Sequence, residues 1–230
     1  SLSRTAAPAP PSLSALWSAV GQGAGGTFAA AATGIPSTYI NDRGLISGQS
    51  DTEVSLPNDP THEELKRVLQ SKKAAVTLGP WRPTSRARAV EIRSALRAGN
   101  IVMQGVGLYL KCFEDRPDEM VSIGLTIETS IGPKCFARVD WRGTNHPNTH
   151  HLCGDLQFID AGQTHFHNPA LCPPGDDPMA HIRENLPIAV AIEARPPNFE
   201  ALLDRCASIL NVTNLTKATP PQWQSRILYP

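Results

Sequence analysis

The sequence predicts an α+β fold in which an antiparallel β-meander sheet packs against a C-terminal amphipathic helix and follows a helical N-terminal region. Three β-rich runs, at 101–113, 120–129 and 134–141, are separated by turn residues at hairpin spacing. After them, apolar residues recur at helical spacing between 197 and 210. Strands joined by short turns pair antiparallel, and the apolar stripe of the helix then needs a sheet face to cover.

Length and charge fit one large domain preceded by an arm. The chain has 230 residues, and its 21 basic side chains balance 21 acidic ones, which excludes a uniformly basic nucleic-acid binder. Residues 1–60 are rich in Pro, Ala and Gly and predict an arm followed by an irregular segment. Residues 61–230 predict a single α+β domain. Its helical part is expected at 61–99, and its sheet, histidine-rich segment and final helix at 100–230.

The domain is predicted to open with a helix that starts just after Thr61. Glu64 follows three positions later, so the two residues form a capping box. Leu65, Val68 and Leu69 then supply an apolar stripe at helical spacing. We therefore expect this stripe to face the core.

A second helix is predicted to start near Thr84 or Ser85 and to end at Gly99-Asn100, a good C-terminal cap signal. Arginines separated by four, seven and four positions would lie within about 60° on one face of that helix. These are Arg82, Arg86, Arg93 and Arg97, of which Arg82 precedes the expected N-cap. Such a face suits phosphate contacts or an acidic partner surface, and an ordinary solvated helix face is the alternative.

Two short apolar runs, at 156–160 and 187–192, predict further strands after the meander. In the final helix, Asn198 is the expected N-cap. Its apolar stripe is expected to face the sheet and consists of Phe199, Leu202, Leu203, Cys206 and Leu210.

The chemistry is expected in a histidine-rich segment, because six of the seven histidines lie between His146 and His181. On a strand, His165 and His167 would present both imidazoles on one face. A metal would need one or two more ligands, and His150 and Cys153 are candidates among the donors nearby. Zinc prefers such nitrogen and sulfur ligands, so the sequence allows a zinc hydrolase or a structural zinc site.

A metal-free site is the competing interpretation of the same residues. One histidine would take the proton of a ribose 2′-hydroxyl, and a second would protonate the leaving oxygen. An arginine would stabilise the charge on the phosphorane. The expected residues are His165, His167 and His151, with Arg138 or Arg142 on the phosphate. In the Asp140-Trp141-Arg142 run, Asp140 and Arg142 are expected on the face opposite Trp141. They could pair there with neighbouring residues or with the histidines, and a surface ion pair is the plain alternative.

Several motifs, in order, resemble small uncharacterised bacterial proteins grouped near the TumE-type toxins of toxin–antitoxin pairs. They are the runs at 135–141, 162–167 and 185–190, the helix at 197–210, and a closing Pro-Pro-x-Trp at 220–223. The resemblance implies a compact α+β fold and a toxin or defence context.

Three function classes stay open at this point. The first is a toxin-like nuclease that cleaves RNA or another phosphodiester, with no cofactor. The second is the zinc hydrolase or structural zinc site, and the third is a non-enzymatic module that binds its partner through the arginine face. The expected partners are nucleic acid, a cognate protein such as an antitoxin, or a second copy of the chain. Five scattered cysteines and the lack of a long apolar run favour a cytoplasmic protein without membrane contact.

Overall fold

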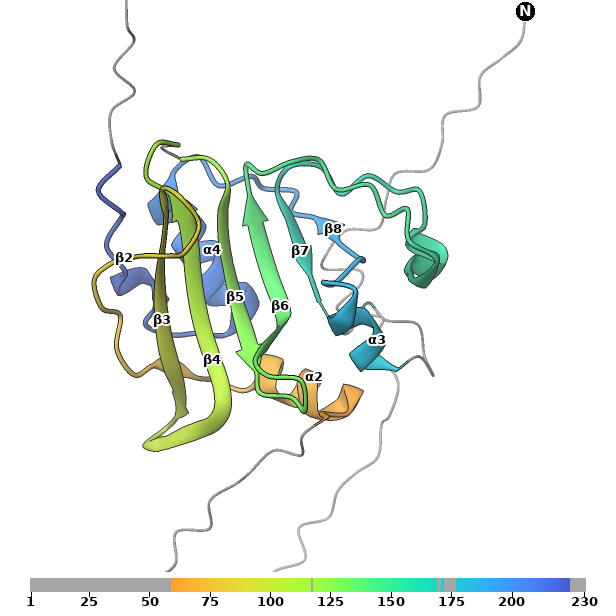
Figure 1. The fold of residues 1–230 in the computed structure, drawn as a ribbon, viewed down its shortest axis with the longest axis horizontal. Helices are drawn as coiled ribbons and strands as arrows, with labels where there is room; N and C mark the ends of the chain where they lie inside the picture. Colours follow the sequence, from red (N-terminus) through yellow and green to blue (C-terminus); the bar gives the residue numbers. More distant parts are fainter. Residues whose placement is uncertain (1–58, 117, 169–170, 172–176, 224–230) are drawn as a thin grey trace, which may run out of the picture.

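The computed structural model describes residues 59–116, 118–168, 171 and 177–223 (Figure 1). The arm expected at 1–60 therefore lies outside the described residues, apart from its last two positions. In chain order, the elements are α2 (His62–Gln70), β1 (Ala74–Ala75), β2 (Arg82–Pro83), β3 (Ala89–Ala98), β4 (Ile101–Phe113), β5 (Val121–Ile127), β6 (Lys134–Trp141), the 3₁₀ turn η1 (His151–Leu156), β7 (His165–His167), α3 (Pro178–Arg183), β8 (Val190–Ala191), α4 (Phe199–Leu210) and η3 (Leu215–Lys217).

The strands form one eight-stranded sheet in the order β1-β3-β4-β5-β6-β7-β8, with β2 also paired to β3. All neighbouring strands are antiparallel, and β4, β5 and β6 are the expected meander. Helices are few and lie beside this sheet, so the α+β class is confirmed.

Helix α4 lies behind the sheet in the view of Figure 1 and covers one of its faces. Its whole predicted stripe is buried, and the Asn198 side chain accepts a hydrogen bond from the Ala201 amide as the N-cap. Along β4, β5 and β6, side chains alternate between the face that α4 covers and the other face of the sheet. The functional site is built on that second face.

Helix α2 follows the sequence prediction closely. Thr61 and Glu64 form the capping box, in which the Thr61 amide donates to Glu64 Oε2 at 2.8 Å. Leu65, Val68 and Leu69 are buried. The short segment that follows is fixed to the C-terminal end of α4, because the Asn214 side chain bonds both the amide and the carbonyl of Ala75.

The second predicted helix is wrong, because 89–98 forms strand β3. Ala, Glu, Arg and Leu favour helices, but Val90 and Ile92 alternate with outward residues and are buried in the sheet core. Gly99-Asn100 is a two-residue hairpin loop, since Ala98 pairs with Ile101 and Gly99 has a φ of 59°. Tertiary pairing with the long strand β4 thus overrides local helix propensity.

The predicted arginine face disappears with that helix. Arg82 lies in β2 and Arg86 in the turn before β3, while Arg93 and Arg97 belong to β3. The four guanidinium groups therefore do not form one helical stripe.

The strand expected at 156–160 is also wrong: this stretch ends η1, and its only described β-pairing is an isolated bridge between Pro147 and Asp160. The strand expected at 187–192 is confirmed in part, as β8.

Candidate functional site

Strand register places polar side chains from five strands in one row across the second sheet face. Each member is opposite the next in the antiparallel pairing. The row is Glu91, Lys111, Ser122, Asp140 and His165. The adjacent row, two residues along each strand, contains Arg93, Tyr109, Gly124, Arg138 and His167. Because neighbouring strands lie about 4.8 Å apart, these side chains face one another across the sheet.

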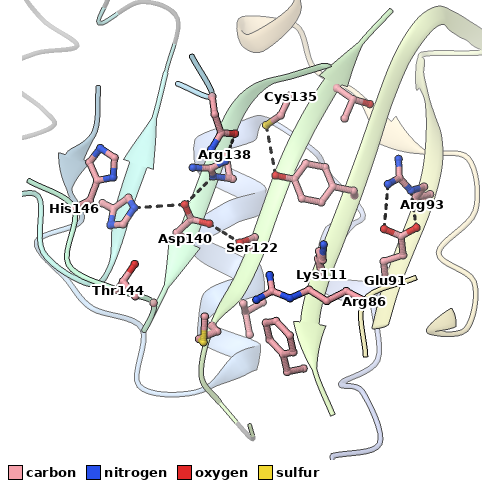
Figure 2. A pocket seen from close by; sticks show the side chains of 18 of the residues that line it. Arg86, Glu91, Arg93, Lys111, Ser122, Cys135, Arg138, Asp140, Thr144 and His146 are labelled. Carbon is pink, nitrogen blue, oxygen red and sulfur yellow. Dashed lines mark hydrogen bonds and ion pairs between the residues drawn. The ribbon is translucent and has the colours of Figure 1, made fainter. Parts of the chain in front are cut away.

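A cleft of about 740 Å³ lies over these rows (Figure 2). Asp140, Arg138 and His146 lie at one end, and Arg86 and Lys111 lie toward β3 and β4. His165 lines the cleft beside Asp140, and Phe113 lines it beneath Arg86. His146 comes from the loop after β6. Its backbone amide donates to the carbonyl of Gly162, which lies in the segment leading to β7. The lining thus combines imidazoles, three carboxylates and several cations in one concave space.

Asp140 is the centre of the hydrogen-bond network. Its carboxylate accepts from Arg138 Nε at 2.7 Å and from the Ser122 hydroxyl. His165 Nε2 and His167 Nε2 lie 3.4 and 3.2 Å from Asp140 Oδ2. Burial alone would raise the pKa of Asp140, but the hydrogen bond from His165 and the Arg138 charge outweigh it and hold this pKa well below its usual range. Asp140 is therefore an anion at neutral pH.

Arg138 is held in one orientation by three neighbours. Besides the bond to Asp140, its Nη1 donates to Asn185 Oδ1 and its Nη2 donates to His167 Nε2, both at 3.1 Å. A guanidinium has five N–H donors, so two remain beyond these three bonds. The side chain is 16% exposed and lines the cleft. Two donors on a fixed planar fork fit the oxygens of a phosphate or carboxylate.

Each of the three histidines at this end bonds a backbone carbonyl through one ring nitrogen. His165 Nδ1 lies 2.7 Å from the Gly162 carbonyl, and His167 Nδ1 lies 3.1 Å from the Ile188 carbonyl. His146 Nε2 lies 3.0 Å from the Pro187 carbonyl. Because a carbonyl only accepts, each of these nitrogens carries the proton.

The ring nitrogen that does not bond a carbonyl has different surroundings in each of the three histidines. Burial lowers the pKa of His167 to about 4, so this ring is neutral and its Nε2 accepts from Arg138. Burial also lowers the pKa of His146, which leaves its Nδ1 as a proton acceptor. His165 Nδ1 lies beside the Gly162 carbonyl, and its Nε2 lies beside the Asp140 carboxylate. The cleft therefore holds the neutral His146 imidazole beside an imidazole that contacts a carboxylate.

His146, His165 and His167 also form a group that can hold a metal ion. Their ligand nitrogens lie within 4.8 Å of one another. A bond from the other ring nitrogen to a backbone carbonyl is the usual way in which proteins orient metal-binding histidines. Asp140 Oδ2 is a fourth donor, at 3.2 to 3.4 Å from two of these nitrogens.

The structure brings together only some of the residues expected from the sequence. His165, His167 and Arg138 meet, as predicted, and Asp140 joins them. His150 and Cys153 are not members of the metal-capable group: the His150 ring lies against His151, 4.2 Å between centroids, and Cys153 donates to the Pro187 carbonyl. The group that the structure brings together thus differs from the predicted ligand set, because it contains His146 and not His150 or Cys153.

Arg142 lies away from the histidines, contrary to the expectation for this residue. Its φ of 49° breaks the strand alternation, so the side chain folds back over the Trp141 ring at 4.5 Å. Its guanidinium donates to the Pro197 carbonyl at 2.8 Å. Arg142 therefore braces the start of α4, and Arg138 is the arginine that contacts His167. His151 is exposed, and its ring stacks on His150.

Sequence reasoning missed Ser122, Tyr109 and Lys111. The signal was present for the last two, since Tyr109, Lys111 and Phe113 occupy alternate positions of the predicted strand 101–113 and share one face. Gly124 makes room for Tyr109, because a Cβ there would lie 2.8 Å from Tyr109 Cε1. The Tyr109 hydroxyl in turn lies 3.5 Å from Cys135 Sγ (Figure 2).

Comparisons of the chain with protein-family models, with curated proteins and with solved structures each give no match. Among the described residues, no helix has the length and apolar character needed to cross a membrane.

Proposed function

We propose that the protein cleaves RNA in this cleft by acid–base transfer of protons, without a metal. The observation that carries the proposal is the fixed Arg138 fork at the same end of the cleft as the imidazoles of His146 and His165, each oriented by a backbone carbonyl. A phosphodiester oxygen binds the two remaining Arg138 donors. His146 and His165, which line the same cleft, then lie beside the reacting atoms.

The reaction exchanges one bond at phosphorus for another. His146 Nδ1 removes the proton of the ribose 2′-hydroxyl, and the 2′ oxygen attacks the adjacent phosphorus. Arg138 stabilises the negative charge that develops on the phosphorane oxygens. The bond to the 5′ oxygen breaks, and the His165 Nε2 proton passes to that oxygen. The products are a 2′,3′-cyclic phosphate and a free 5′-hydroxyl.

His167 is assigned a positioning role in this scheme. It is fully buried, and its pKa of about 4 leaves it neutral at physiological pH. Its Nε2 accepts from Arg138 and so helps to aim the guanidinium. His146 therefore takes the place of His167 in the acid–base pair expected from the sequence.

The proposal is tested by incubating purified protein with a single-stranded RNA and mapping the product ends. We expect His146→Ala and His165→Ala each to reduce the rate by 100-fold or more, in the range of about 10²–10⁴ that general acid–base groups contribute. His151→Ala is the matched control, because His151 is exposed and outside the cleft. Intact RNA with the wild-type protein, or equal loss in all three variants, would refute the proposal.

A zinc-dependent hydrolase is the second candidate, and one observation favours it. All three imidazoles are oriented by backbone carbonyls, with Asp140 beside two of them, which is a donor set that fits zinc. His146, His165, His167 and Asp140 would hold the ion, and a bound zinc would supply Lewis acidity. Arg138 competes with that ion for Asp140. Elemental analysis of protein purified without added metal separates the candidates: one zinc per chain, lost in His146→Ala, would favour the hydrolase.

The toxin context and a cognate inhibitor stay predictions of the sequence resemblance. A ribonuclease activity is consistent with that context.

A further inference from the structure

Two cations in the cleft have no acidic partner among the described residues. Lys111 lies in the same row as Asp140, two strands away, and makes no ion pair or hydrogen bond through its amine. Within the part of the chain that the structure describes, the contact of the Arg86 side chain is with the Phe113 ring. The other cleft arginines are neutralised, Arg93 by two bonds to Glu91 at 2.8 and 3.1 Å, and Arg138 by Asp140. The unbalanced positive charge of the cleft therefore lies at the Arg86 and Lys111 end.

An aromatic ring supports one of these cations. The Arg86 guanidinium lies over the Phe113 ring, with its carbon 4.8 Å from the centroid. Phe113 also lines the cleft, and the exposed Arg86 comes from a turn rather than from the sheet. A guanidinium plane held on a ring is a surface on which nucleic-acid bases stack. A free ammonium beside it, on Lys111, suits a backbone phosphate.

We propose that Arg86, Lys111 and Phe113 form a second nucleotide subsite, which binds a single-stranded nucleic acid next to the cleavage point. The base stacks on Arg86, with Phe113 beneath the guanidinium, and the phosphate binds Lys111. This inference rests on the proposed function in one respect, the position of the scissile bond relative to the subsite. The chemistry of the subsite requires an unpaired base, so duplexes are excluded as its ligand.

The spacing on the sheet fits a neighbouring nucleotide rather than the one being cleaved. Two strand separations lie between Lys111 and Asp140, which is about 10 Å at the usual interstrand distance. Figure 2 shows Arg86 and Lys111 at the far side of Ser122 from His146. A strand bound across the sheet therefore contacts Arg138 and the Arg86 subsite with successive parts of its backbone.

The test measures binding of a fluorescent single-stranded DNA oligonucleotide by anisotropy. DNA has no 2′-hydroxyl, so its binding is measured without cleavage. For the Arg86→Gln/Lys111→Gln double variant, we expect weaker binding and a slope of log affinity against log salt reduced by about 0.7, because Lys111 makes the one phosphate contact of the subsite and each single-strand contact contributes about 0.7. The matched control is Arg82→Gln/Arg97→Gln, which removes the same charge from β2 and β3 outside the cleft.

The base contact is tested with Phe113→Leu and two probes. We expect about tenfold weaker binding of the oligonucleotide and unchanged binding of inorganic polyphosphate, which has no bases. Equal losses in the two double variants, no loss in either, or equal effects of Phe113→Leu on both probes would overturn the subsite. Normal oligonucleotide binding by a protein that leaves RNA intact would refute the proposed function while the subsite stands.

Discussion

Replacing Arg138 by lysine separates charge from geometry at the centre of the cleft. A lysine ammonium keeps the ion pair with Asp140 but has no planar fork. The wild-type guanidinium also bonds Asn185 and His167, and these two contacts are lost. At about 1 kcal/mol for each hydrogen bond, we expect Arg138→Lys to lower the free energy of unfolding by about 2 kcal/mol. Urea denaturation at pH 7 measures this loss.

The effect on catalysis should be larger than the effect on stability. The two free N–H donors of Arg138 act on the phosphorane charge, and removal of one such donor typically costs 10²–10³ in kcat. We therefore expect kcat for RNA cleavage to fall about 100-fold or more in Arg138→Lys, under conditions where the variant is folded.

Arg142→Lys is the matched control for this substitution. Arg142 lies four residues further along the chain and contacts Trp141 and Pro197 instead of the histidines. We expect a small loss of stability and an unchanged kcat. A normal kcat in Arg138→Lys, or the same loss of kcat in Arg142→Lys, would refute the role assigned to Arg138.

Two further predictions concern stability and are measured by urea denaturation. Gly124→Ala should lower the free energy of unfolding by about 1–3 kcal/mol, because its Cβ would lie 2.7 Å from the Ala137 carbonyl oxygen and 2.8 Å from Tyr109. In the control Gly79→Ala, the new Cβ meets nothing within 4 Å, so the loss should be less than about 1 kcal/mol. Equal losses in the two variants would contradict the packing described for Tyr109. Burial lowers the pKa of Lys73 to about 8 from its usual 10.5, so the folded state disfavours the charged form, and this cost is relieved as the pH rises from 8 to 10.5. The stability of the protein relative to Lys73→Met should therefore increase by about 2 kcal/mol between pH 7 and pH 9.5, and a constant difference would contradict the buried ammonium.

Much of the fold was readable from local patterns. The capping box at Thr61 and the apolar stripe of α4 are short-range signals, and both elements form where they were expected. The strand β3 was not readable in this way, because Gly99-Asn100 serves equally as a helix C-cap and as a two-residue hairpin. Only the pairing of β3 with β4 decides between these structures, and that pairing is a long-range property.

The sequence indicated which types of residue form the candidate site, but not which of them lie opposite one another in the sheet. The His-x-His spacing indicated that His165 and His167 share a face, and β7 confirms it. That Asp140 lies opposite His165, and Arg138 opposite His167, depends on how β6 and β7 are aligned across a connection of more than 20 residues. The left-handed backbone of Arg142, which removes it from the site, has no signal in the residue type.

The most direct test of the central claim is RNA cleavage by protein stripped of metal and kept in a chelator. The proposed mechanism uses only His146, His165 and Arg138, so it predicts undiminished cleavage with 2′,3′-cyclic phosphate ends. Cleavage that disappears with the metal and returns with zinc, or that yields 5′-phosphate ends, would contradict it.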